Sequence, residues 1–115
     1  MTTAPPPDFE PLASAGVSAG NLYLAREACE RYLAGAESVA LLSRDGELLI
    51  LPLTRESGGG LLLKVRNARG DRVIHAQEFF RAHGYAEDFA PRRVAMRWEE
   101  AAAALVLSGV PVVVR

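Results

Sequence analysis

The side chains most able to do chemistry in this sequence are a group of cations in its second half. Residues 61–115 carry nine basic and six acidic side chains, whereas residues 1–60 carry four and eight. Arginine guanidinium groups on neighbouring strands can converge on phosphate or on an acidic partner protein. The candidates for binding a nucleic acid or another anion are Lys64, Arg66, Arg69, Arg72, Arg92, Arg93 and Arg97.

The same cations have a simpler interpretation as the solvated face of a sheet. The chain holds 12 arginines and one lysine, so arginine is common in it for reasons of composition. Glu78, Glu99 and Glu100 are available to neutralise part of the charge. The formal net charge of −1 gives the whole chain no attraction to nucleic acid. Nucleic-acid binding is therefore the alternative functional hypothesis and not the leading one.

His75, Glu78 and His83 are the weak candidates for a metal or acid–base site. Imidazole is a common metal ligand and a common base at neutral pH. On one helix, histidines at these two positions would not form the i,i+4 pair of a helical metal site, although Glu78 follows His75 by one turn. The sequence contains no nucleophile elbow, phosphate loop or dinucleotide fingerprint. We expect no metal, no cofactor and no enzymatic activity.

Cys29 is the only cysteine, so neither an intramolecular disulfide nor a cysteine-based zinc site can form within the chain. It lies on the apolar side of a predicted helix, where a buried and unreactive thiol is expected. The first residues lack a basic region followed by an apolar core, and no apolar run reaches the roughly 18 residues of a membrane span. These features favour a cytoplasmic protein without a membrane segment.

The triplet Arg69-Gly70-Asp71 is a known receptor-recognition signal in some extracellular proteins. Here it stands between two apolar segments, and Asn67 and Gly70 are residues that tolerate the backbone angles of a tight turn. Because no export signal is present, a hairpin loop explains the triplet better than receptor binding.

Hydrophobic spacing and turn residues predict the secondary structure. Asp45-Gly46 between two apolar runs is a strong hairpin signal, and Pro52 places the second strand at a sheet edge or bulge. Val94, Met96 and Trp98 alternate with polar residues, as in a half-buried strand. The predicted elements are a helix at about 21–34, strands at 38–43 and 47–53, a strand in 60–66, an extended segment at 71–75, a short helix in 76–84, a strand at 93–98, a helix near 99–107 and a terminal strand. The segment 104–107 could instead return as a strand paired with 93–98.

These elements predict an α+β fold: an antiparallel sheet of about four to six strands, with an N-terminal helix and one or two further short helices packed on one face. Residues 1–17, rich in proline, are expected to be a flexible arm, and residues 18–115 a single domain. Strand 47–53 and the terminal strand should be apolar edges, which favour pairing with a second copy. The leading hypothesis is a small, non-catalytic interaction module that self-associates and binds an unidentified protein partner.

The sequence "RGDRVIHAQEFFRAHGY", followed by a predicted strand pair, resembles the core of the AbrB-type swapped-hairpin DNA-binding domains. The resemblance covers about residues 64–107. His75 stands where that family has proline, and the helical segment is one residue too long. The resemblance implies a dimeric DNA-binding protein.

Overall fold

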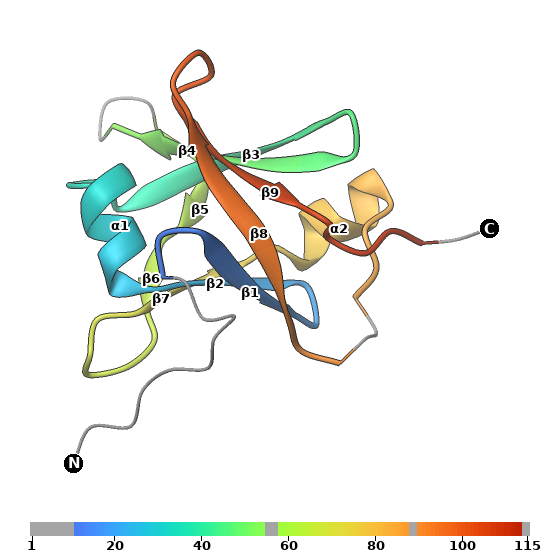
Figure 1. The fold of residues 1–115 in the computed structure, drawn as a ribbon, viewed down its shortest axis with the longest axis horizontal. Coiled ribbons are helices and arrows are strands. Elements are labelled where there is room, and N and C mark those ends of the chain that lie inside the picture. Colours follow the sequence, from blue (N-terminus) through green and yellow to red (C-terminus); the bar gives the residue numbers. More distant parts are fainter. Residues whose placement is uncertain (1–10, 55–57, 88–89, 114–115) are drawn as a thin grey trace.

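The computed structural model describes residues 11–54, 58–87 and 90–113. In this part the chain forms nine strands and two short helices (Figure 1). In chain order the elements are β1 (Ser14–Ser18), β2 (Asn21–Leu24), α1 (Arg26–Tyr32), β3 (Ser38–Arg44), β4 (Glu47–Leu53), β5 (Leu61–Leu62), β6 (Lys64–Val65), β7 (Arg72–His75), α2 (Gln77–His83), β8 (Arg92–Glu99) and β9 (Ala104–Ser108). All strands belong to one sheet, so the architecture is mainly β.

The sheet curls until its two ends nearly meet. Its strand order is β5-β3-β4-β9-β8-β1-β2-β7-β6, and only Leu63 separates the first and last strands of this order along the chain. The Leu63 N–H donates a hydrogen bond to the carbonyl of Glu37, beside β3, at 2.9 Å. The Leu63 carbonyl accepts one from the Arg72 guanidinium of β7, also at 2.9 Å. Residues 61–65 therefore close the sheet into a barrel-like ring that leaves little strand edge exposed.

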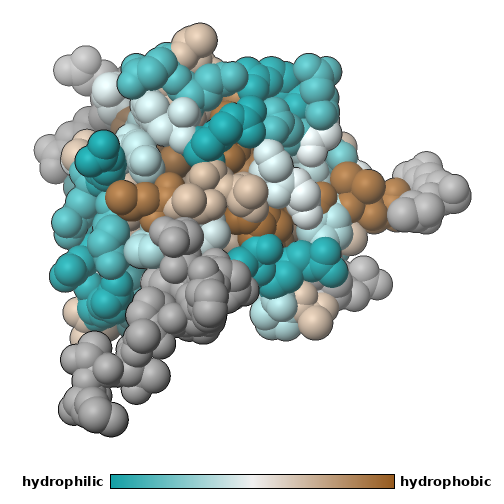
Figure 2. Space-filling model, viewed as in Figure 1, coloured by the Kyte–Doolittle hydropathy of each residue, from teal (hydrophilic) through white to brown (hydrophobic). Residues whose placement is uncertain are grey.

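The interior of this ring holds the main hydrophobic core. Alternate residues of each strand point inward, and Leu22 of β2 and Ile74 of β7 are fully buried there. Phe80, the one fully buried aromatic side chain among the described residues, enters the same cluster from α2. Figure 2 shows hydrophobic residues in the middle of one face with hydrophilic residues around them, and more near the C-terminal end, where Val112 and Val113 are half-exposed.

The predicted α+β fold with four to six strands and an N-terminal helix is wrong. The sheet has nine strands, and the two helices have seven residues each and lie at opposite sides of the ring in Figure 1. The helix predicted at 21–34 begins only at Arg26, because residues 21–24 form β2. In β2, Leu22 and Leu24 are buried while Tyr23 is half-buried, which is the period of a strand. Its hydrogen-bonded neighbours β1 and β7 decide in favour of the strand.

The helix predicted near 99–107 is also wrong, and the alternative of a returning strand is confirmed. β8 turns at residues 100–103, with Ala103 at a positive φ of 49°, and β9 pairs with β8 from Glu99↔Ala104 to Ala95↔Ser108. The apolar run is buried on both faces of the sheet: Leu105 faces the main core, whereas Val106 packs with Leu49 in a second small cluster. When a strand is buried on both faces, its sequence does not alternate between apolar and polar residues, so it cannot be told from a buried helix.

Other elements are confirmed. β3 and β4 form the predicted hairpin around Asp45 and Gly46, whose φ angles are 50° and 81°. Such positive angles give a two-residue hairpin turn the same twist as its strands. α2 occupies the predicted position and ends at Gly84, with a left-handed φ of 75°. β8 covers the predicted strand at 93–98, with Val94 and Met96 buried.

The ends of the chain differ from expectation where the structure describes them. Ser14–Ser18 form β1, between β2 and β8, although residues 14–17 were assigned to the flexible arm; residues 1–10 lie outside the described residues. β4 is not an edge strand, because Leu48–Ile50 pair with β9, and Pro52 lies beyond that pairing. In the described part of the chain no helix has the length and apolar character needed to cross a membrane.

Candidate anion-binding groove

Five neighbouring strands, β6, β7, β2, β1 and β8, present a row of side chains on the outer face of the ring. The pairing register places Lys64 opposite Val73, Val73 opposite Tyr23, Tyr23 opposite Gly16 and Gly16 opposite Arg93. The residues on either side of Gly16 and Tyr23, such as Val17 and Leu22, point into the core. The row therefore crosses the outer surface from one cation to another.

A groove of about 410 Å³ lies over the centre of this row. We call it the arginine groove; it is formed principally by Gly16, Ser18, Tyr23, Arg66, Arg92 and Arg93. Its three guanidinium groups come from two segments distant in sequence, the end of β6 and the start of β8. The pairing order β8-β1-β2-β7-β6 brings these segments to the two sides of Tyr23. A volume of this size is in the usual range for small-ligand sites.

The contacts inside the groove orient its side chains. The Arg66 guanidinium carbon lies 4.8 Å from the centroid of the Tyr23 ring, within the range of a cation–π interaction. The Nε of Arg93 donates a hydrogen bond to the Ser14 hydroxyl at 3.1 Å. Arg92 and Arg93 make further interactions as well, so neither of them is free. The groove therefore combines one guanidinium over an aromatic ring with two further arginines in its lining.

Gly16 gives the groove its floor. A Cβ atom at this position would lie 3.2 Å from the Cβ of Tyr23 on the adjacent strand, closer than most real contacts. Glycine lets the Tyr23 side chain lie low over β1. The backbone of the strand is thereby exposed beside the ring, in the space between Arg66 and Arg93.

The remaining predicted cations have structural partners or lie outside the groove. Arg97 donates two hydrogen bonds to the Glu47 carboxylate, at 2.9 and 3.1 Å. Those hydrogen bonds, together with one from Ser108, lower the pKa of Glu47 to about 2. The Arg72 guanidinium donates to the Leu63 carbonyl and so holds the ring closure. Lys64 is exposed on the outer row beyond Val73 and does not line the groove.

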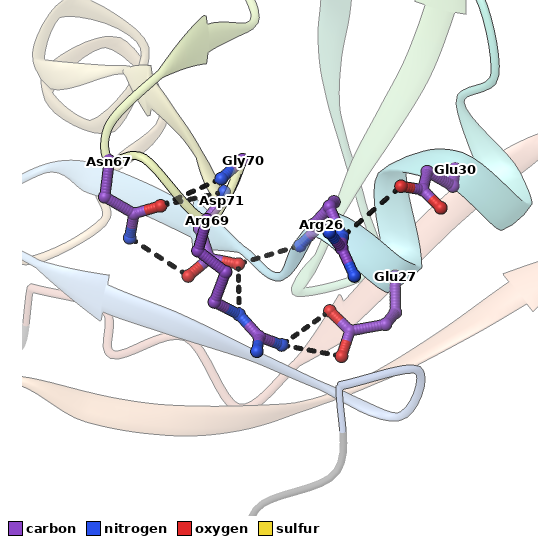
Figure 3. A network of polar contacts seen from close by, with 7 residues as sticks. All are labelled: Arg26, Glu27, Glu30, Asn67, Arg69, Gly70 and Asp71. Carbon is purple, nitrogen blue, oxygen red and sulfur yellow. Dashed lines mark hydrogen bonds and ion pairs between the residues drawn. The ribbon is translucent and has the colours of Figure 1, made fainter.

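The Arg69-Gly70-Asp71 triplet forms a loop docked on the start of α1 (Figure 3). Asn67 accepts hydrogen bonds from the Gly70 and Asp71 backbone N–H groups, both at 3.1 Å, as predicted for a tight turn. The Nη2 atom of Arg69 donates hydrogen bonds to both carboxylate oxygens of Glu27, at 2.9 and 2.6 Å. Arg69 is thus held by carboxylates, and the predicted loop is confirmed.

Asp71 acts as a cap for α1 from a distant position in the sequence. Ala25, at the N-cap position, has no side-chain hydrogen bond, but the Arg26 backbone N–H donates to the Asp71 carboxylate at 2.9 Å. The Asn67 amide donates to the other carboxylate oxygen at 3.0 Å. Burial raises the pKa of Asp71, yet the hydrogen bonds from Arg26, Asn67 and Arg69 outweigh it and hold the pKa below its ordinary value.

The weak metal candidates do not meet at one site. His75 Nδ1 lies 2.9 Å from the Asn21 side-chain oxygen, on the surface between β7 and β2. The His83 ring contacts Phe79 at the end of α2, with ring centroids 4.2 Å apart and planes tilted by 33°, and Glu78 is exposed on the same helix. Within residues 11–54, 58–87 and 90–113, no group of three histidine, cysteine or acidic side chains could hold a metal ion.

The cysteine thiol is buried among core residues. Its burial raises the pKa of Cys29 to about 11, which outweighs the opposite effect of the Arg72 charge. A thiol with a raised pKa forms little thiolate near neutral pH and is a poor nucleophile. The expected buried and unreactive cysteine agrees with this geometry.

Sequence reasoning missed Gly16 and Tyr23, the residues at the centre of the groove. The signal was the alternation of Leu22, Tyr23 and Leu24, which places a tyrosine on the opposite face from two core leucines. It was overlooked because the same leucines also fit a helical spacing. Sequence reasoning also missed a second aromatic feature, the stacking of Tyr32 on Trp98.

A comparison of the chain with known proteins found no matching family model, no matching curated protein and no matching solved structure. The resemblance to AbrB-type domains is therefore carried only by the residues quoted for it.

Proposed function

We propose that the protein binds single-stranded nucleic acid in the arginine groove and catalyses no reaction there. The observation that carries this proposal is that Arg66, Arg92 and Arg93 line one groove with Tyr23, and that the Arg66 guanidinium lies over the Tyr23 ring. Guanidinium groups bind phosphate oxygens in pairs, through a planar fork of donors. An aromatic ring beside them supplies a surface on which a base can stack.

The size of the groove favours a single strand over a duplex. A space of about 410 Å³ accommodates one or two nucleotides, whereas specific duplex binding buries a surface of roughly 1,000 Å² or more. Because the net charge of the chain is −1, the electrostatic attraction between the protein and the nucleic acid has to come from the cations of the groove. We therefore expect modest affinity with a salt dependence set by about three phosphate contacts.

Fluorescence anisotropy of a labelled, mixed-sequence single-stranded oligonucleotide tests the proposal. Three phosphate contacts on a single strand predict that a fourfold rise in salt weakens binding about 20-fold. Replacing Tyr23 by leucine, which suits a strand, should remove a stacking contact and weaken binding about 5- to 150-fold. An unlabelled duplex of the same sequence should compete less well than the single strand.

A matched pair of charge variants separates the groove from general electrostatics. Arg66→Gln should weaken binding severalfold, because it removes both a phosphate donor and the cation over Tyr23. Arg81→Gln makes the same charge change on α2, where Arg81 is 65% exposed and pairs with Glu87. The proposal fails if the unchanged protein does not bind at low salt, or if the two variants weaken binding equally.

Self-association through apolar edge strands was the leading expectation from the sequence. Of the expected edges, β4 is not open to a second copy over Leu48–Ile50, since it is paired there on both sides. Light scattering on the samples used for anisotropy would measure the mass of the protein directly. A dimeric protein that binds the oligonucleotide as expected would show that self-association and nucleic-acid binding are independent of each other.

A further inference from the structure

A second groove, distinct from the arginine groove, lies between α1 and the end of β8. We call it the aromatic groove; its volume is about 1000 Å³ and it is lined by Tyr32, Trp98, Glu27, Glu30, Glu100 and Arg31, with Leu12 at one side. It shares no lining residue with the arginine groove. Its occupant therefore has to be argued from its own chemistry.

Two stacked rings form the centre of the aromatic groove. Tyr32, the last residue of α1, and Trp98 of β8 have ring centroids 5.5 Å apart and planes only 8° from parallel. Both side chains are partly exposed while they also pack against the core. Rings fixed in this way present an aromatic surface that needs little ordering when a ligand binds.

This aromatic surface already attracts a cation within the chain. The Arg31 guanidinium carbon lies 5.9 Å from the centroid of the Tyr32 ring. The faces of tyrosine and tryptophan rings carry partial negative charge, and tryptophan is the stronger of the two in binding cations. Trp98 is therefore suited to bind a second guanidinium.

The charges around the rings have the sign that a cationic ligand requires. Three glutamates and one arginine line the groove, and one of the glutamates, Glu27, is already paired with Arg69. Among the described residues Glu30 pairs with Arg26, at 3.3 Å, and these two side chains are 68% and 50% exposed, respectively. Such an exposed pair contributes little to stability, so Glu30 can exchange its partner at small cost. Glu100 is exposed at the turn after β8 and forms no ion pair within the described residues.

We propose that the aromatic groove binds an arginine-bearing segment of a partner protein. The guanidinium stacks on Trp98, and its edge donates hydrogen bonds to the carboxylates of Glu30 and Glu100. Arginine fits both parts of this arrangement, because its planar group can stack and donate a fork of hydrogen bonds at once. Lysine would supply the charge without the stacking plane. The inference does not depend on nucleic-acid binding by the arginine groove.

Trp98 is the only tryptophan of the chain, so its fluorescence reports on this groove directly. The probe is an acetylated and amidated peptide of sequence GSRGRSG, titrated into the full chain at low salt. We expect a saturable change in Trp98 emission. The same peptide with glutamine in place of both arginines should give no saturable change.

A double variant, Glu30→Gln with Glu100→Gln, should weaken peptide binding about fivefold or more, because it removes two exposed charge pairs. Glu78→Gln is a control for the loss of one acidic charge elsewhere, since Glu78 is exposed on α2 and does not line this groove. These surface changes leave the core intact, which circular dichroism would verify. The proposal is overturned if emission does not saturate, if the neutral peptide binds equally well, or if Glu78→Gln has as large an effect as the double variant.

Discussion

Replacing Asp71 by alanine should destabilise the protein by about 2 kcal/mol. The Asp71 carboxylate accepts a hydrogen bond from the Arg26 N–H in the first turn of α1, at 2.9 Å, and a cap of this kind contributes about 1 kcal/mol. The Asn67 amide donates to the same carboxylate at 3.0 Å, and because this hydrogen bond is exposed we assign it the value of an ordinary intramolecular hydrogen bond, about 1 kcal/mol. We add nothing for Arg69, whose side chain is 51% exposed.

Thermal and urea unfolding would measure this loss. For a domain of this size, about 2 kcal/mol lowers the Tm by roughly 8 °C. Asp71→Asn should cost about half as much, because an amide oxygen can still accept the Arg26 hydrogen bond while the charge is lost. Asp45→Asn is the matched control, since Asp45 lies at an exposed turn with a positive φ of 50° that asparagine also adopts.

The pH dependence gives a second check on the same reasoning. The folded-state pKa of Asp71 is lowered, so its stabilising effect is complete above the ordinary pKa of about 4 and is lost as the pH falls through the folded value. The difference in unfolding free energy between the unchanged protein and Asp71→Asn should therefore shrink below about pH 4. A difference that is independent of pH, or an Asp71→Ala variant as stable as Asp45→Asn, would refute the capping role.

Two further predictions concern acid stability and a tight turn. The hydrogen bonds from Arg97 and Ser108 lower the pKa of Glu47 from 4.5 to about 2. The stability that Glu47 contributes should therefore disappear as the pH falls across this interval. Glu47→Gln should remove that part of the acid transition, as measured by circular dichroism. Gly20→Ala should cost at least about 2 kcal/mol in urea unfolding, because Gly20 has a φ of 79° and a Cβ there would lie 2.9 Å from the Gln77 side chain. Gly46→Ala should lower the free energy of unfolding by only about 1 kcal/mol through backbone strain, because Gly46 has a φ of 81° and nothing lies within 4 Å of a Cβ there. Equal losses in the two variants would show that the contact between Gly20 and α2 is unimportant.

Features that depend on a few adjacent residues could be predicted from the sequence. The Asp45-Gly46 turn, the Gly84 helix end and the loop at Asn67 each follow from local backbone preferences, and the structure has all three. The alternation in β8 was likewise readable, because one of its faces is buried and the other exposed. Such signals need no knowledge of distant partners.

Elements that depend on distant partners could not be predicted in this way. Residues 21–24 fit both a helix and a strand, and only the pairing with β1 and β7 decides between them. Residues 104–107 are buried on both sides of the sheet, so their sequence lacks alternation. The division of the arginines into structural and groove residues also depends on long-range pairs, such as Arg97 with Glu47, 50 positions apart.

The strand order has a consequence for the protein while it is being synthesised. Without β8 and β9, the remaining strands still adjoin in the order β1-β2-β7-β6 and β5-β3-β4, joined at Leu63. Such an open sheet would have unpaired edges at β1 and β4, and the hairpin of β8 and β9, made after the other seven described strands, fits between them. Until that hairpin leaves the ribosome, two strands with apolar side chains can pair with other chains. Nascent chains that end before residue 92 should therefore aggregate, and protection should come once residues 92–108 have been added.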